Sequence, residues 1–201
     1  MSLTVMSLTA LLVPTYRNML GTLAGLLDTV ERQAPTQAES LLSARLATDM
    51  LPLAAQLRFA AFLAQEATFR LRGQAMPPSL EAVAAEGRHA GDAPGSFAEA
   101  RDRIGQALSH LDGLAGDALD AGATLPIAIE LPGGLTFDMT GETYARDWAL
   151  PQFYFHVVTA YAILRNQGIE IGKAEYVPHM FAYLRSTPAA SAQAEPGDAR
   201  S

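Results

Sequence analysis

The chain has 201 residues, of which 49% are hydrophobic and 17% charged, and its formal net charge is −7. A chain of this length and composition can bury a full hydrophobic core, which argues against extensive disorder. Its acidic balance and its single lysine argue against a nucleic-acid binder, because a phosphate backbone would be repelled. The absence of cysteine excludes disulfides, zinc–thiolate sites and cysteine nucleophiles.

The N-terminal run MSLTVMSLTALLVP has the hydrophobicity of a signal peptide but lacks its basic start. The run passes directly into a helical apolar pattern, so we interpret it as the beginning of a helix. No segment reaches the length of about 18 uninterrupted apolar residues that a transmembrane helix needs. We therefore expect a cytoplasmic protein without a membrane partner.

Apolar residues at helical spacing predict a first helix over residues 9–32 and a second over residues 36–72. A proline separates the two, since the residue before a proline is disfavoured in the α conformation. Thr36 and Glu39 have the spacing of a capping box at the start of the second helix. Pro52 falls inside this helix, where it removes a backbone donor and predicts a kink.

Residues 74–95 are rich in Pro, Gly, Ala and Glu, which predicts a long connection with a short helical turn over residues 80–85. A second capping box, formed by Ser96 and Glu99, opens a third helix over residues 96–114. The long connection is therefore expected to be the crossover of a helical bundle.

The apolar period then changes from about 3.6 to about 2 residues, which predicts two short strands near residues 124–139. A Pro-Gly-Gly turn at residues 132–134 separates the strands and favours a β-hairpin. A lone hairpin is marginally stable in water, so this one is expected to pack on the bundle or across a dimer. The alternating apolar residues are Leu125, Ile127, Ile129, Leu131, Leu135, Phe137 and Met139.

The last long helix begins at Thr140, whose side chain can cap it, and Pro151 kinks or restarts it. Residues 152–166 are almost all apolar, which predicts a position at the centre of the bundle. The sequence thus predicts a mainly α-helical protein, a four-helix bundle with a small β-hairpin inserted before the last helix. Residues 1–185 are expected to form a single domain and residues 186–201 a disordered tail.

Four stretches carry a resemblance to a known family: Met19–Leu23, Ala44–Leu53, Leu150–Gly168 and Ile171–Lys173. In matching order over about residues 8–178, they resemble a bacterial family of unknown function within the DinB/YfiT-like superfamily. The resemblance implies a four-helix bundle that is often homodimeric. Many superfamily members bind a divalent metal through three histidines, one on the second helix and two, four residues apart, on the fourth. Some are isomerases or transferases that use a thiol cofactor.

Only part of that metal pattern is present in this sequence. His156 lies on the expected fourth helix, but Gln152 and Ala160 occupy the positions four residues away. On the second helix, the comparable inward polar residue is Asp49 rather than a histidine. An intact three-histidine site is therefore not expected, and a divalent metal, if one binds, would use Asp49 and His156.

Asp49 and His156 are the candidate catalytic residues. Asp49 falls on the apolar stripe of the predicted second helix, where an unpaired buried carboxylate is strongly unfavourable. Its compensation could come from Arg45, four residues earlier, from backbone loosened by Pro52, or from His156 or a metal across the bundle. A local ion pair or backbone hydrogen bond is the commoner arrangement. His156 is likewise more often a satisfied core residue, although an Asp–His pair could act as a general base.

The aromatic residues around the last helix favour core packing, but Tyr161 or Tyr16 pointing at His156 would create a small polar pocket. Arg45, Gln152 and Tyr161 are therefore the candidate ligand-binding residues. Of the other histidines, those at positions 89 and 179 are expected to be exposed, and the facing of the one at position 110 stays open.

Two functions follow from these observations. The first is a homodimeric small-molecule-binding or structural module without an intact metal site. The alternative is a metal- or thiol-dependent enzyme of the transferase, isomerase or hydrolase kind, with a pocket at Asp49 and His156. A mutant test separates them, since a structural His156 affects stability and a functional one affects ligand binding.

Overall fold

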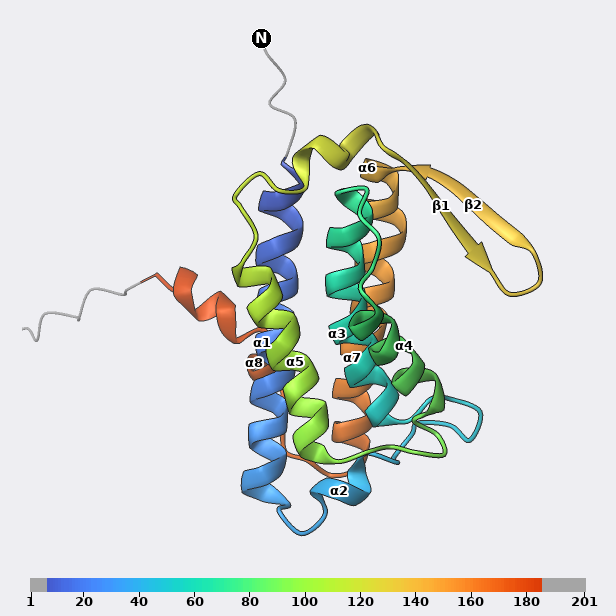
Figure 1. Cartoon of the computed structure of the whole chain (residues 1–201). Coiled ribbons are helices and arrows are strands. Elements are labelled where there is room, and N and C mark those ends of the chain that lie inside the picture. Colours follow the sequence, from blue (N-terminus) through green and yellow to red (C-terminus); the bar gives the residue numbers. More distant parts are fainter. Residues whose placement is uncertain (1–6, 186–201) are drawn as a thin grey trace, which may run out of the picture.

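The computed structural model describes residues 7–185, and the predicted disordered tail at 186–201 lies outside the described residues (Figure 1). Within them, the chain forms a helical bundle with one antiparallel hairpin, which confirms the predicted fold class. No helix in this part of the chain is long and apolar enough to cross a membrane. The bundle consists of α1 (Leu8–Gln33), α3 (Leu53–Leu71), α5 (Phe97–Asp112) and α7 (Leu150–Asn166). The shorter helices are α2 (Ala38–Leu41), α4 (Pro78–His89), α6 (Gly141–Tyr144) and α8 (Lys173–Tyr176).

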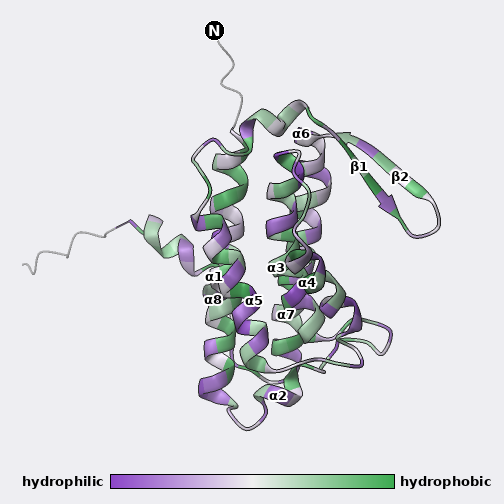
Figure 2. Ribbon diagram, in the orientation of Figure 1, coloured by the Kyte–Doolittle hydropathy of each residue, from purple (hydrophilic) through white to green (hydrophobic). Residues whose placement is uncertain are grey.

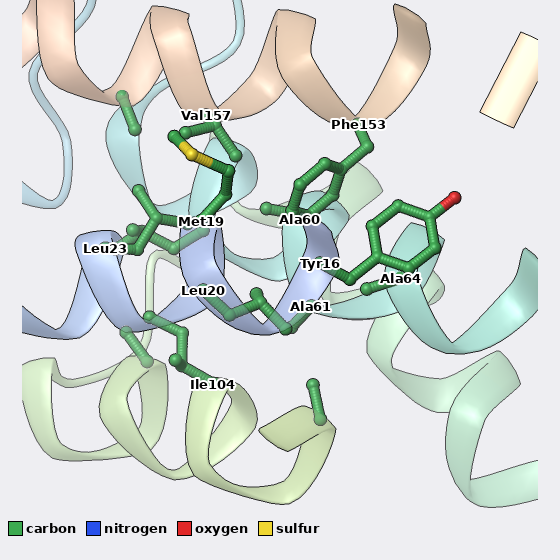
Figure 3. Packing of buried hydrophobic residues seen from close by; sticks show 14 of the residues in the cluster. Tyr16, Met19, Leu20, Leu23, Ala60, Ala61, Ala64, Ile104, Phe153 and Val157 are labelled. Carbon is green, nitrogen blue, oxygen red and sulfur yellow. The ribbon is translucent and has the colours of Figure 1, made fainter. Parts of the chain in front are cut away.

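Helix α3 is the central element of the bundle, because it packs against α7, α4 and α5. Six of its thirteen buried positions are alanines, which let neighbouring helices approach closely. Figure 3 shows large side chains of α1, α5 and α7 packed around these small residues. They are Tyr16, Met19, Leu20 and Leu23 of α1, Ile104 of α5, and Phe153 and Val157 of α7. The alternating bands of hydrophobic and hydrophilic residues in Figure 2 follow from this one-sided burial.

The predicted second helix over residues 36–72 is wrong in its first half. The structure has only the short α2, followed by an irregular segment, and α3 begins after Pro52. Pro52 has extended backbone angles as the residue that precedes α3, so it starts the helix instead of kinking it. Glu39 forms no capping box; its carboxylate accepts a hydrogen bond from the backbone N–H of Phe97 at 3.0 Å and fastens the start of α5.

The connection after α3 contains more helix than predicted, because α4 extends well beyond the expected single turn. The capping box of Ser96 and Glu99 is confirmed at the start of α5. The hairpin is also confirmed, with β1 (Pro126–Leu131) paired to β2 (Leu135–Thr140). It packs one face on the bundle through two buried isoleucines, Ile127 and Ile129. At the junction of hairpin and bundle, the 3₁₀ turn η1 (Asp120–Thr124) lies beside α6.

Thr140 caps the last helical segment, as predicted, and Pro151 lies in the first turn of α7, so the α-helix restarts there, one of the two predicted outcomes, without a gap in the helical segment. The reason is the π-helical turn η2 (Ala145–Ala149), which links α6 directly to α7. A π turn contains one extra residue per turn, so the hydrogen-bond pattern shifts just before the proline. After α7 the chain turns at Gly168, whose φ is +86°, and ends in α8 and the 3₁₀ turn η3 (Pro178–Tyr183).

Candidate functional site

His156 is half-buried on α7, and its partner is a residue of α3 that the sequence analysis did not select. The imidazole Nδ1 lies 2.8 Å from Oε1 of Gln56, a side chain that is 1% exposed. The amide nitrogen of Gln56 donates to the carbonyl oxygen of Leu51 at 3.0 Å. That bond fixes which end of the amide faces the imidazole, so Nδ1 of His156 carries the proton and donates it to Oε1.

The opposite ring nitrogen of His156 is therefore a free acceptor. Nε2 has no hydrogen-bond partner in the described part of the chain. Two aromatic rings flank the imidazole: Phe59 at a centroid distance of 5.1 Å and Phe155, edge-on, at 5.4 Å. Burial among these apolar groups lowers the pKa of His156 to about 4. The imidazole is thus neutral at physiological pH, with one nitrogen fixed and the other available.

The predicted Asp49–His156 pair does not form. Asp49 is exposed, in a turn of the irregular segment that precedes α3. The prediction failed because the apolar spacing before Pro52 belongs to a loop, where it specifies no common helical face. Arg45 is half-buried in the same segment, and no ion pair joins it to Asp49 within residues 7–185. Because its carboxylate is not buried, Asp49 does not need the compensating partner that the sequence led us to expect.

Gln152 and Tyr161 form no hydrogen bond with His156 within residues 7–185. Gln152 is half-buried one turn earlier on α7. Tyr161 instead packs edge-on against Tyr176 of α8, with ring centroids 5.5 Å apart, and lines a separate cavity of about 290 Å³. The hydroxyl of Tyr16 is buried and has no hydrogen-bond partner in the part of the chain that the structure describes, and its ring packs on Phe153. The small tyrosine-lined pocket expected beside His156 is therefore not formed.

The remaining histidines are placed as follows. His110 faces α3, where its Nε2 lies 2.7 Å from the hydroxyl of Thr68 and its ring stacks on Phe69. His89 is exposed, as predicted, whereas His179 is half-buried, which corrects the expectation of exposure.

The residues around His156 do not fit the three-histidine metal site that the resemblance implies. The position on α3 that reaches across to His156 is held by Gln56, a neutral amide that already uses both its ends. Within residues 7–185, no three His, Cys, Asp or Glu side chains gather in a way that could hold a metal ion. A glutamine signals this site only weakly in the sequence, since it interrupts the apolar run of α3 in the same way as a surface residue would.

Comparison with known proteins places the chain in a family. The profile of the family described as "Domain of unknown function (DUF1993)" matches residues 8–177. A crystal structure of a DinB family member protein from Shewanella denitrificans is 31% identical, with a TM-score of 0.67. The similarity covers 92% of this chain and 95% of that one. No curated protein matches the sequence. The chain therefore belongs to the DUF1993 family and has the fold of the DinB-like proteins.

Proposed function

We propose that this chain is a small-molecule-binding module whose ligand donates a hydrogen bond to Nε2 of His156. The observation that carries this proposal is the Gln56–His156 pair, which fixes one nitrogen of a neutral imidazole and leaves the other free. The ring lies at the α3–α7 surface, which we define by Leu51, Phe59, Phe155 and His156. Phe155 is 56% and Leu51 is 40% exposed there, so apolar area is available to a ligand.

The chemistry of this surface favours an uncharged, partly aromatic ligand with one hydroxyl or N–H donor. A neutral imidazole attracts no anion, and the surrounding rings would desolvate a charged ligand without compensating it. The lowered pKa of His156 also makes Nε2 a weak base, since an efficient general base has a pKa near the working pH. The arrangement therefore supports binding better than proton abstraction.

Phenol and anisole test this proposal, because they share a ring and differ in the hydroxyl donor. We expect phenol to shift the imidazole nitrogen signals of His156 in nuclear magnetic resonance titrations, and anisole to do so at least about tenfold more weakly. His156→Phe keeps the aromatic bulk and should abolish the difference between the two compounds. His89→Phe, at an exposed histidine, is the matched control and should leave it unchanged. Equal binding of phenol and anisole by the wild-type chain would refute the proposal.

We further propose that the module is a homodimer that associates through α7. Beside the ligand surface, two apolar side chains one turn apart on this helix are exposed: Tyr154 at 37% and Val158 at 46%. Exposed apolar residues grouped on one helix favour an interface, because a second copy would remove them from water.

Sedimentation equilibrium tests the dimer with two matched substitutions. Val158→Lys places a charge in the proposed interface and is expected to yield monomers. Leu135→Lys makes the same change at a 62% exposed position of the hairpin and is expected to leave the dimer intact. A wild-type chain that sediments as a monomer at micromolar concentration would show that α7 is not a self-association surface.

A further inference from the structure

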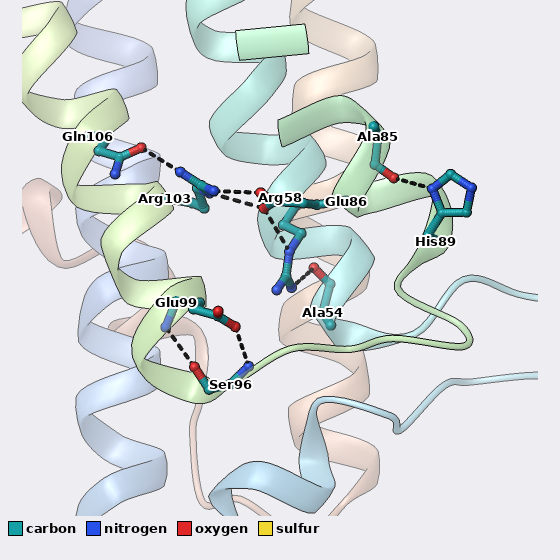
Figure 4. A network of polar contacts seen from close by, with 9 residues as sticks. All are labelled: Ala54, Arg58, Ala85, Glu86, His89, Ser96, Glu99, Arg103 and Gln106. Atoms are coloured by element: carbon teal, nitrogen blue, oxygen red, sulfur yellow. Dashed lines mark hydrogen bonds and ion pairs between the residues drawn. The ribbon is translucent and has the colours of Figure 1, made fainter. Parts of the chain in front are cut away.

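A second polar cluster lies between α3, α4 and the start of α5 (Figure 4). Its centre is Arg58 of α3, which is only 3% exposed. Nη1 of Arg58 donates to the carbonyl oxygen of Ala54 at 3.1 Å, and this is the guanidinium's one hydrogen bond within residues 7–185. Nε lies 3.4 Å from a carboxylate oxygen of Glu86 but has no hydrogen-bond partner among the described residues. A buried guanidinium with unused donors is unfavourable unless something else receives them.

Glu86 pairs with Arg58 only at ion-pair distance, because another arginine takes its hydrogen bonds. Arg103 of α5 binds both carboxylate oxygens of Glu86, through Nε at 3.0 Å and through Nη2. The same arginine also donates to Oε1 of Gln106 at 3.0 Å. A single carboxylate thus serves two guanidinium groups, and the bidentate geometry gives it to Arg103. The donors of Arg58 remain available.

The side chain of Arg58 lines an open cavity of about 490 Å³, and so does His89. Gly95, at the rim, has a φ of +68°, and a Cβ atom there would clash with Nη2 of Arg58 and lie 2.6 Å from Oε2 of Glu99. The absence of a side chain at Gly95 therefore lets a cationic and an anionic group approach the same point at the rim of the cavity. Hydrogen bonds from Ser96 lower the pKa of Glu99, so its carboxylate stays ionised.

The charges around this cavity balance, with Arg58 and Arg103 opposite Glu86 and Glu99. A simple anion would lie beside two carboxylates in a chain of net charge −7, and a simple cation would lie beside two guanidinium groups. A ligand that carries both charges avoids both conflicts. We propose that this cavity binds a small zwitterion of the amino-acid class, with its carboxylate on Arg58 and its ammonium group on Glu99.

Three probes of equal chain length test the contribution of each charge: 2-aminobutyrate carries both charges, butyrate only the negative one, and butylamine only the positive one. We expect 2-aminobutyrate at millimolar concentration to shift the backbone amide signals of Gly95 and Ser96 in two-dimensional nuclear magnetic resonance spectra. Butyrate and butylamine should bind at least about tenfold more weakly, because each lacks one of the two ion pairs. Equal binding of butyrate would overturn the assignment to a zwitterion, and no shift with any probe would overturn the site.

Two substitutions test the two ends of the ligand separately. Arg58→Met keeps the buried aliphatic volume but removes the carboxylate contact. Glu99→Gln removes the charge and keeps an oxygen for the backbone N–H of Ser96, so the capping box is preserved. Each should weaken binding of 2-aminobutyrate about tenfold or more, while Arg17→Met, at an exposed ion pair with Asp112, should not change it. Unchanged binding in either cavity variant, with the fold intact by its amide spectrum, would contradict the proposal.

Discussion

Gln56 and Arg58 lie two residues apart on α3, and both are buried, yet they are satisfied to different degrees. Gln56 faces α7, carries no charge, and uses both ends of its amide in hydrogen bonds to Leu51 and His156. Arg58 faces α4 and α5, carries a charge, and makes one hydrogen bond in the described part of the chain. The first site is complete within the protein and presents only Nε2 of His156 to solvent. At the second site, Arg58 keeps donors without hydrogen bonds. We therefore interpret the first site as a network that positions His156 and the second as a cavity whose donors a ligand can use.

The largest expected effect is the contribution of His156, on α7, to the pH dependence of the free energy of unfolding. The pKa of His156 is 6.5 in an ordinary setting and about 4 in the folded chain, so the unfolded chain binds the proton more tightly. Stability is therefore fully present above pH 6.5 and is lost as the pH falls toward 4, by about 3 kcal/mol in all. Urea unfolding of the wild type and of His156→Phe at pH 7.5 and 4.5 measures this contribution as the difference between the two pH dependences.

The exposed His89 supplies the control for this experiment. His89→Phe should show the same loss of stability at acidic pH as the wild type, because its ring is not buried. An equal acid response of His156→Phe and the wild type would mean that His156 is as easily protonated in the folded chain as in the unfolded one. The contrast between a neutral site at Gln56 and His156 and a charged site at Arg58 would then be lost.

A smaller effect is expected from removing the two buried polar side chains one at a time. Gln56→Leu leaves the Nδ1–H of His156 and the carbonyl of Leu51 without partners, and should lower the free energy of unfolding by about 2 kcal/mol. Arg58→Met removes a buried charge whose ion pair with Glu86 includes no hydrogen bond, while Glu86 keeps Arg103, so its effect should stay below about 1 kcal/mol. Chemical denaturation at neutral pH measures both.

The double variant Gln56→Leu with His156→Phe sharpens this result. It replaces both partners with apolar groups, so it should recover part of the stability that Gln56→Leu loses. If Arg58→Met proves as destabilising as Gln56→Leu, then Arg58 is already well paired in the protein. The proposed zwitterion site would then lose its physical basis.

The sequence predicts the bundle well wherever a helix has its own local signals. The capping box of Ser96 and Glu99 marks the start of α5, and the alternation around the Pro-Gly-Gly turn marks the hairpin. Prediction failed around Pro52, where helical spacing continues through a loop and the local pattern does not show where the chain leaves the helix. The capping signal at Glu39 is misleading for a similar reason, since its carboxylate serves a distant backbone N–H.

The candidate site was harder to predict than the fold. His156 stands out in the sequence because an ionisable residue interrupts an apolar helix, and the structure gives it a specific partner. The identity of that partner depends on how α3 is rotated against α7, which in turn depends on where α3 begins. A helix that began before Pro52 would present Asp49 to the interior of the bundle, whereas α3, which begins at Leu53, presents Gln56 to His156. The sequence does not single out Arg58, because one buried arginine in an amphipathic helix has the sequence pattern of a surface residue.

The π turn at Ala145–Ala149 has a consequence for how this family can vary in length. One residue corresponds to a rotation of about 100° around a helix axis, so the extra residue sets the angle between the start of this helical segment and α7. Upstream of the turn, Thr140 is fixed by the hairpin, and downstream His156 is fixed by Gln56. A single-residue deletion inside the turn would relax it to an ordinary α-helix, yet hairpin and imidazole could no longer both keep their places. Relatives that lack this residue should therefore differ either in how the hairpin is attached or in what faces α3 at the position of His156.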